Sequence, residues 1–199
     1  MVPFSVTYDY RCPFARIGHL HVIEALEAGE DWDVTFVPFS LRQMHVEEGD
    51  PSVWDDPDSD SGLLVLQVSV VVRDLHPDQF LSVHRRLFDL RHVESRDLRE
   101  REVVSEALSE FGIDPDSVYA EIADGWPLEA VRKAHEAAVA EHNVWGVPTF
   151  VVGDDAVFVR LMEGPDGDPA TSVRTIERLI DSITGWPQLN EFKHTRVRR

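Results

Sequence analysis

The chain has 199 residues, of which 43% are hydrophobic, so it can bury the core of one domain without cross-links to stabilise it. Its 37 acidic and 19 basic residues give a formal net charge of −18, which argues against nonspecific binding to nucleic acid or to anionic membranes. No stretch approaches the roughly 20 apolar residues of a membrane span, and a single cysteine excludes an internal disulfide framework.

The N-terminal segment predicts a right-handed β-α-β unit. A strand is expected over 3–8, and Met1-Val2-Pro3 leads into it without the basic and apolar regions of a secretory signal, so we expect a cytoplasmic protein. A helix is expected over 13–27, with Pro13 in its first turn and Gly29 beyond its end. A buried strand over 33–39 follows.

The middle of the chain predicts helices after an acidic loop over 47–62. Proline and acidic caps indicate helices that start at Pro77, at Asp97 with Glu100, at Asp114-Pro115 and at Pro127, and Gly112 is expected to end the second of them. Residues 63–72 contain five valines, which favour a strand, but the length of the segment and its helical neighbours favour a helix.

The C-terminal part returns to strands and closes with a helix. A hairpin is expected from 149–152 and 156–161, and a helix from 171–184 with Gly185 as its stop. Pro148 predicts a turn into an edge strand and a cis peptide bond. Residues 187–199 form a basic tail, which we expect to be solvated.

Cys12 lies between the first strand and the first helix and is followed by Pro13. Free N–H groups and the dipole at a helix start favour a thiolate, so we expect a pKa lowered by roughly one unit. Arg11 and Arg16 would add to this effect if they lean towards the sulfur. We therefore expect Cys12 to be a nucleophile.

Two motifs resemble the DsbA-like branch of the thioredoxin superfamily: Cys12-Pro13-Phe14-Ala15 and Trp145-Gly146-Val147-Pro148-Thr149. Together with the late segment 190–196, the second motif also resembles the actinobacterial mycothiol-dependent nitroreductase group. The resemblance implies an α/β thioredoxin-like fold with an α-helical insertion and a cis-proline loop beside the cysteine. The expected domains are a discontinuous thioredoxin-like domain (1–40 and 144–186), a helical insertion (41–143) and the basic C-terminal tail (187–199).

Ala15 stands where the family has the second cysteine of the motif. We therefore expect a monothiol mechanism in place of the family's dithiol cycle. We expect a thiol-disulfide oxidoreductase in which Cys12 forms a mixed disulfide with mycothiol or glutathione as co-substrate. The partner substrate is electrophilic or a disulfide. The resemblance implies thiol-binding backbone groups at Val147, Pro148 and Thr149, and the expected substrate pocket is formed by Tyr8, Phe14, Ala15 and Trp145.

Two alternatives remain open at this point. One is an enzyme like glutathione-S-transferase kappa or 2-hydroxychromene-2-carboxylate isomerase, whose members commonly have serine at the position of Cys12. The other is a redox-inactive binding protein with the same fold. The sequence also leaves open whether the protein forms a homodimer.

Metal and nucleotide cofactors are not expected. His19 and His21 point to different faces of one helix, and the acidic run Asp56, Asp58 and Asp60 lacks the spacing of a calcium loop. The chain has neither a Gly-x-Gly-x-x-Gly motif nor a P-loop.

Overall fold

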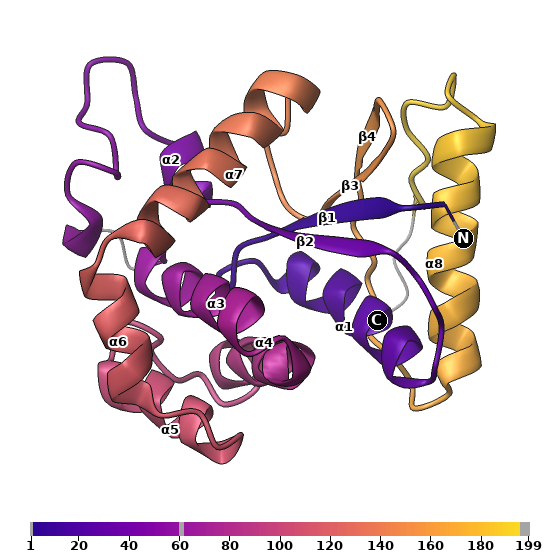
Figure 1. The fold of residues 1–199 in the computed structure, drawn as a ribbon. Coiled ribbons are helices and arrows are strands. Elements are labelled where there is room, and N and C mark those ends of the chain that lie inside the picture. Colours follow the sequence, from indigo (N-terminus) through magenta and orange to yellow (C-terminus); the bar gives the residue numbers. More distant parts are fainter. Residues whose placement is uncertain (1, 60–61, 196–199) are drawn as a thin grey trace.

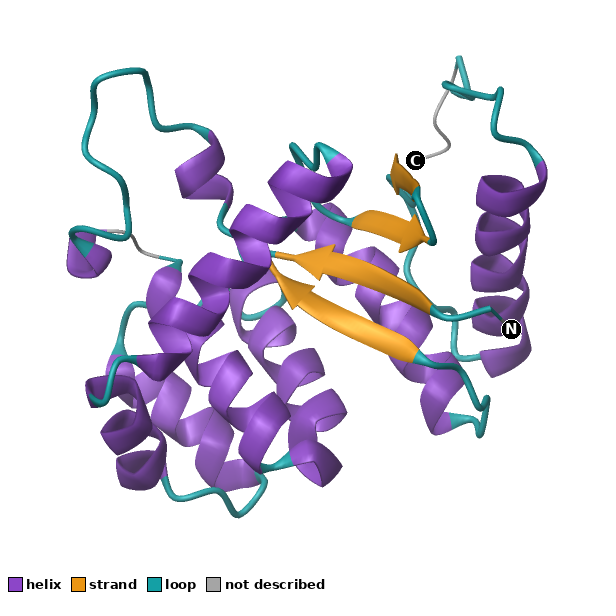
Figure 2. Ribbon diagram, turned by 45° about the horizontal axis from the view of Figure 1, so that its top comes forward, coloured by secondary structure: helices purple, strands orange, loops and turns teal. Residues whose placement is uncertain are grey.

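The computed structural model describes residues 2–59 and 62–195. Four strands in these residues form one sheet with the order β2-β1-β3-β4 (Figures 1 and 2). Their bounds are β1 (Phe4–Tyr8), β2 (Val34–Pro38), β3 (Thr149–Val152) and β4 (Asp155–Phe158). β1 pairs in parallel with β2 and antiparallel with β3, so the two ends of the chain share one sheet.

Helices α1 (Pro13–Glu27) and α8 (Pro169–Gly185) pack against each other on the sheet, where α1 contacts β1 and α8 contacts β3 and β4. The remaining helices form a helical body (Figure 1). They are α2 (Leu41–Met44), the 3-10 turn η1 (Pro57–Ser59), α3 (Leu63–Leu75), α4 (Pro77–His92), α5 (Arg101–Glu110), α6 (Pro115–Ala123) and α7 (Trp126–His142). This helical body contacts β2 through α7 and α1 through α4. The order β-α-β, helices, β-β-α agrees with the thioredoxin-like fold that the motifs imply.

Helix α3 is the centre of the helical body and packs against α4, α6 and α7. Most of its side chains are buried, including Val65, Val68 and Val71. Valine loses at most about 0.7 kcal/mol of helix propensity, whereas burial of one valine side chain contributes about 1.5–3 kcal/mol. Tertiary packing on all sides therefore makes this valine-rich segment a helix.

Several details differ from the sequence-based expectation; the second hairpin strand, expected over 156–161, spans Asp155–Phe158. β3 is an interior strand between β1 and β4, not an edge strand; Pro148 is compatible with this because it precedes the first ladder residue, Thr149. Helix α5 starts at Arg101, since the carboxylate of Asp97 accepts from the backbone N–H of Arg99 in a turn before the helix. Gly185 is the last residue of α8 and not its stop.

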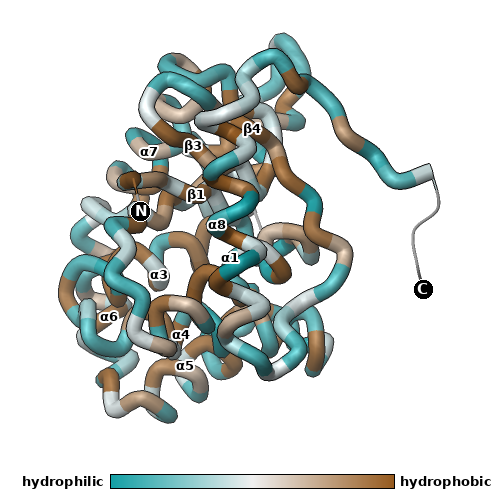
Figure 3. Tube along the Cα trace, turned by 90° about the vertical axis from the view of Figure 1, so that its right-hand side faces the viewer, coloured by the Kyte–Doolittle hydropathy of each residue, from teal (hydrophilic) through white to brown (hydrophobic). Residues whose placement is uncertain are grey.

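The hydropathy of the chain follows this architecture. Apolar segments converge where the sheet meets the helices, whereas residues 187–195 leave the body as an exposed tail (Figure 3). Arg196, Arg198 and Arg199 of the expected basic tail lie outside the described residues. In the described part of the chain, no helix has the length and apolarity needed to cross a membrane.

Candidate active site around Cys12

Cys12 is the N-cap residue of α1. Its backbone is extended (φ −92°, ψ 116°), and its sulfur accepts the backbone N–H of Ala15 at 3.4 Å. Pro13 lacks an N–H and occupies the first helical turn, where that donor has no partner in a helix. The sulfur is half-buried. The sequence Cys-Pro thus places a thiol at the start of a helix with a free N–H directed at it.

The loop before β3 lies directly against this sulfur. The thiol of Cys12 donates to the carbonyl oxygen of Val147 at 3.2 Å. The Val147–Pro148 peptide bond is cis, as expected from the loop sequence. A Cβ atom at Gly18 of α1 would lie 3.3 Å from Cγ of Pro148, so the close approach of loop and helix favours glycine there. The fold therefore joins two motifs that are 135 residues apart.

Thr149 stabilises this loop from the inside. Its hydroxyl donates to the carbonyl oxygen of Gly146 at 2.7 Å, and its backbone N–H donates to Oγ1 of Thr7 at 2.9 Å. Only 4% of Thr149 is exposed. Its side chain shapes the loop and is not open to a ligand, whereas the backbone of Val147 faces the sulfur.

A family model described as the DSBA-like thioredoxin domain matches residues 5–166. The chain belongs to this family. Its fold is the thioredoxin-like DsbA fold, shared with DsbA of Pseudomonas aeruginosa (TM-score 0.56, 20% identity, 94% of this chain and 86% of that one). The cytosolic disulfide reductase DsbM from Pseudomonas aeruginosa, solved with GSH, is also similar (TM-score 0.59, 17% identity, 90% of this chain and 99% of that one).

A relative by sequence is the uncharacterised protein YwbO of Bacillus subtilis. It is 23% identical over 181 residues, which cover 78% of this chain and 89% of YwbO. This similarity extends over most of the DsbA-like domain and carries no information about activity.

In this DsbA-like domain, burial raises the pKa of the Cys12 thiol, although N–H groups of Ala15 and Phe14 act in the opposite direction. The nearby carboxylate of Asp9 raises the pKa further. The sequence-based expectation of a lowered pKa is therefore wrong. The helix start contributes as expected, but it is outweighed by desolvation of the charged form.

The two arginines beside Cys12 do not offset the effect of burial on the pKa of its thiol. The guanidinium of Arg11 pairs with Asp9 at 3.0 Å, and that of Arg16 pairs with Asp89 at 2.7 Å. Both cations are bound to carboxylates, so neither is directed at the sulfur.

The predicted pocket residues fall into two groups. Tyr8 is fully buried and bonds Ser69 of α3 through its hydroxyl at 2.6 Å, so it belongs to the core and does not line an open pocket. Burial raises its pKa to about 12. Ala15 is also fully buried. Phe14 is half-buried beside Cys12, and Trp145 is 62% exposed and packs on Phe158 with ring centres 4.6 Å apart.

A buried chain of hydrogen bonds, which no motif in the sequence indicates, lies behind the Cys12 loop. The hydroxyl of Tyr10 bonds Nδ1 of His84 at 2.5 Å, Nε2 of His84 bonds Nδ1 of His19 at 2.9 Å, and Nε2 of His19 bonds the carbonyl oxygen of Thr7 at 3.1 Å. Since that carbonyl only accepts, one proton arrangement satisfies every atom: Tyr10 donates to His84, His84 to His19, and His19 to Thr7. Both histidines are then neutral, in agreement with burial, which lowers the pKa of both.

The backbone of the Cys12 loop is held by two further groups. The buried carboxylate of Asp9 accepts from the backbone N–H groups of Arg11 and Leu41, both at 2.9 Å. Nε2 of His92 donates to the carbonyl oxygen of Tyr10 at 2.8 Å. No sequence spacing identifies these contacts, because His92 and Leu41 are distant along the chain.

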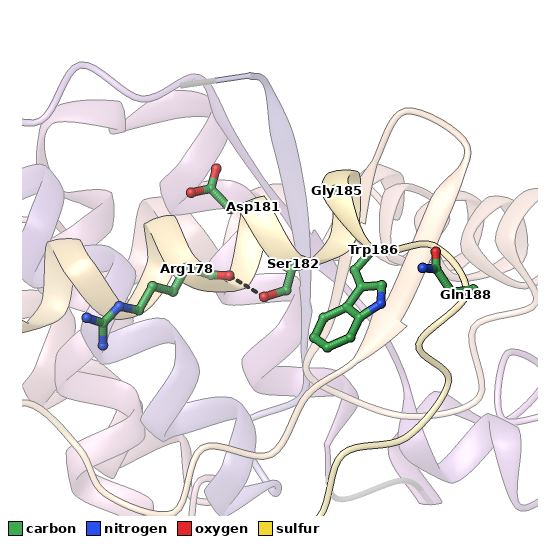
Figure 4. A pocket seen from close by; sticks show the side chains of 6 residues that line it. All are labelled: Arg178, Asp181, Ser182, Gly185, Trp186 and Gln188. Atoms are coloured by element: carbon green, nitrogen blue, oxygen red, sulfur yellow. Dashed lines mark hydrogen bonds between the residues drawn. The ribbon is translucent and has the colours of Figure 1, made fainter.

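A surface hollow of about 680 Å³ lies at the end of α8 and contains none of the Cys12 site residues. It is lined by Arg178, Asp181, Ser182, Gly185, Trp186 and Gln188 (Figure 4). The hydroxyl of Ser182 already donates to the carbonyl oxygen of Arg178 at 2.6 Å. Among the described residues, no cluster of three histidine, cysteine, aspartate or glutamate side chains is suited to a metal ion.

Proposed function

We propose that this protein is a cytoplasmic thiol-dependent oxidoreductase with Cys12 as its single nucleophile. The observation that carries the proposal is the 3.2 Å contact between the Cys12 sulfur and the carbonyl oxygen of Val147 at the start of α1 in a DsbA-like domain. Cys12 is the only cysteine of the chain, so the second thiol comes from a small molecule such as mycothiol or glutathione. Similarity to a cytosolic disulfide reductase supports the location.

The proposed reaction proceeds by thiol–disulfide exchange. The Cys12 thiolate attacks one sulfur of a disulfide substrate, and the other sulfur leaves as a thiolate that takes up the proton lost by Cys12. A first small thiol releases the bound half of the substrate and becomes joined to Cys12, and a second small thiol releases the first as a small-molecule disulfide. The substrate gains two electrons and two protons, and the two small thiols lose them.

Contacts at Val147 support a role for this residue in activating the sulfur. Its carbonyl oxygen accepts the thiol hydrogen of Cys12, a bond that favours the protonated sulfur. A peptide-like thiol that pairs with the backbone of Val147 competes for this carbonyl and weakens that bond. Exposed apolar surface of Phe14 and Trp145 flanks the place where such a thiol would bind.

The proposal is tested by intact-mass spectrometry of protein incubated with glutathione disulfide or mycothiol disulfide. We expect one adduct on Cys12 that excess thiol removes, together with a disulfide reductase activity that requires added thiol. Cys12→Ser should lose both, whereas Arg178→Ala on α8, away from the Cys12 site, should keep both. Ala15→Cys should form a reducible internal disulfide, because the first and fourth motif residues meet in the first helical turn.

A second candidate is favoured by the raised pKa of Cys12. A protonated thiol acts as a hydrogen-bond donor, as a serine would, in an enzyme like glutathione-S-transferase kappa or 2-hydroxychromene-2-carboxylate isomerase. In that case Cys12→Ser retains full thiol-dependent activity and no adduct forms. This result would overturn the covalent proposal.

A further inference from the structure

We propose that Arg160 binds a carboxylate of the small thiol that reacts at Cys12, so that the protein prefers an acidic thiol to a neutral one. The inference rests on the mixed-disulfide function proposed above. It concerns a surface next to the sulfur formed by Phe14, Trp145, Phe158 and Arg160, which we call the ledge.

The ledge is formed by segments that flank the Cys12 site. Phe14 lies two residues beyond Cys12, and Cζ of Arg160 lies 5.4 Å from the centre of its ring. On the side of the cis-proline loop, Trp145 packs on Phe158, and a Cβ atom at Gly146 would lie 3.4 Å from the Phe158 ring. The guanidinium of Arg160 thus lies beside the ring of Phe14, a chain neighbour of Cys12, and the Trp145–Phe158 pair lies beside the cis-proline loop.

Arg160 differs from the other arginines near the sulfur in its partners. Arg11 and Arg16 form ion pairs with Asp9 and Asp89. In the described ranges 2–59 and 62–195, the ion pairs and hydrogen bonds do not include the Arg160 side chain. The carboxylate of Glu191 in the tail pairs with Lys193, which lowers the pKa of Glu191. The charge of Arg160 makes only a small contribution to this shift.

The backbone around Arg160 is held in place. Val159 donates its N–H to the carbonyl oxygen of Pro148 at 3.0 Å, which attaches this segment to the cis-proline loop. On the other side, Nε2 of the buried His21 donates to the carbonyl oxygen of Glu163 at 3.0 Å. The backbone that carries Arg160 is therefore attached to the cis-proline loop and to α1 before a ligand binds.

A guanidinium with free N–H groups is well matched to a carboxylate, which accepts two parallel hydrogen bonds. The net charge of −18 opposes an anionic ligand at long range, but charges more than about 8 Å away are screened at physiological salt. The local cation therefore decides the preference. Glutathione carries two carboxylates, whereas a sugar thiol such as mycothiol carries none.

The test compares the rate at which Cys12 is modified by glutathione disulfide with the rate for the neutral 2-hydroxyethyl disulfide, both followed by intact mass. The ratio of the two rates cancels any effect of a mutation on the sulfur itself. Arg160→Ala should lower this ratio by about 2- to 5-fold, as expected for an exposed charge-assisted pair. Arg160→Lys should restore much of it, and Arg178→Ala on α8 should leave it unchanged.

The outcomes separate the two proposals. A ratio that stays within about 1.5-fold in Arg160→Ala overturns the role of Arg160 while Cys12 modification, and with it the proposed function, stands. Wild-type protein that reacts with neither disulfide at Cys12 overturns both proposals.

Discussion

At the scale of single residues, Cys12 is subject to opposing effects. The N–H groups at the start of α1 favour its thiolate, whereas burial and the carboxylate of Asp9 favour the thiol, and the thiol hydrogen is bonded to Val147. Desolvation prevails, because each helix-start donor contributes only about 1 kcal/mol. The site therefore holds a nucleophile that is largely protonated before a ligand arrives.

We predict that the pKa of Cys12 lies above that of a free cysteine thiol. The rate of alkylation by iodoacetamide, measured over a series of pH values, should rise only in the alkaline range. Asp9→Asn should shift this profile to lower pH, since it removes a charge that raises the pKa. An apparent pKa below that of free cysteine in the wild type would contradict the burial argument.

At the scale of elements, the end of β1 and the loop that joins it to α1 are connected to the helical body by polar contacts. Tyr8 bonds Ser69 of α3, Tyr10 bonds His84 of α4, and the carboxylate of Asp9 bonds the backbone of Leu41 in α2. These groups are buried, and unsatisfied partners there would be costly. The helical body thus positions the loop that carries Cys12.

Tyr10→Phe should lower the free energy of unfolding by about 1–3 kcal/mol, because it leaves Nδ1 of His84 buried without a donor. Urea unfolding monitored by circular dichroism measures this loss. Tyr119→Phe is a matched control: its hydroxyl donates to the carbonyl oxygen of Arg101 at an exposed position, so the loss should be below about 1 kcal/mol. Equal losses in the two variants would show that the buried Tyr10–His84 bond adds no more stability than an exposed one.

At the scale of the whole molecule, the interior carries several neutral histidines inside a strongly acidic protein. Burial lowers the pKa of His19 and of His135 to about 4, and it lowers the pKa of His84 as well. Nδ1 of His135 has no hydrogen-bond partner, and its ring packs on Phe39 with centres 4.3 Å apart. Folding therefore requires these imidazoles to stay uncharged.

We predict that acid destabilises the protein between about pH 6.5 and pH 4 through these histidines. Above pH 6.5 the folded and unfolded chains both hold neutral imidazoles, so their contribution is fully present. As the pH falls, only the unfolded chain binds protons, and stability is lost by at most about 1.4 kcal/mol per pH unit for each histidine.

The measurement is urea unfolding at about pH 7.5 and about pH 5, for wild type and for His135→Phe. The variant replaces one titrating ring by an aromatic ring of similar shape against Phe39 and Trp54. It should lose less stability on acidification than the wild type. The same acid sensitivity in both proteins would exclude His135 as a contributor, because carboxylates of the acidic surface are shared by the two.

Much of the site could be predicted from sequence because its two parts are local motifs. Cys12 with Pro13 is a helix-start pattern, and Val147-Pro148 is a loop pattern whose role follows from the family resemblance. The contacts of Asp9, His84 and Arg160 could not be predicted, since each depends on residues brought together only by folding. The direction in which the pKa of Cys12 shifts could not be predicted either, because burial is not encoded in any one motif.

The sequence by itself determined the order of the strands and longer helices, the start of α1 at Pro13 and the loop at Pro148, because caps, prolines and hydrophobic periodicity act within a few residues. Only the tertiary structure decided that β3 is an interior strand, that Tyr8 belongs to the core, and that the sulfur is desolvated. The physical reason is distance along the chain. Strand order, burial and electrostatic environment arise from contacts between segments that have no common local pattern.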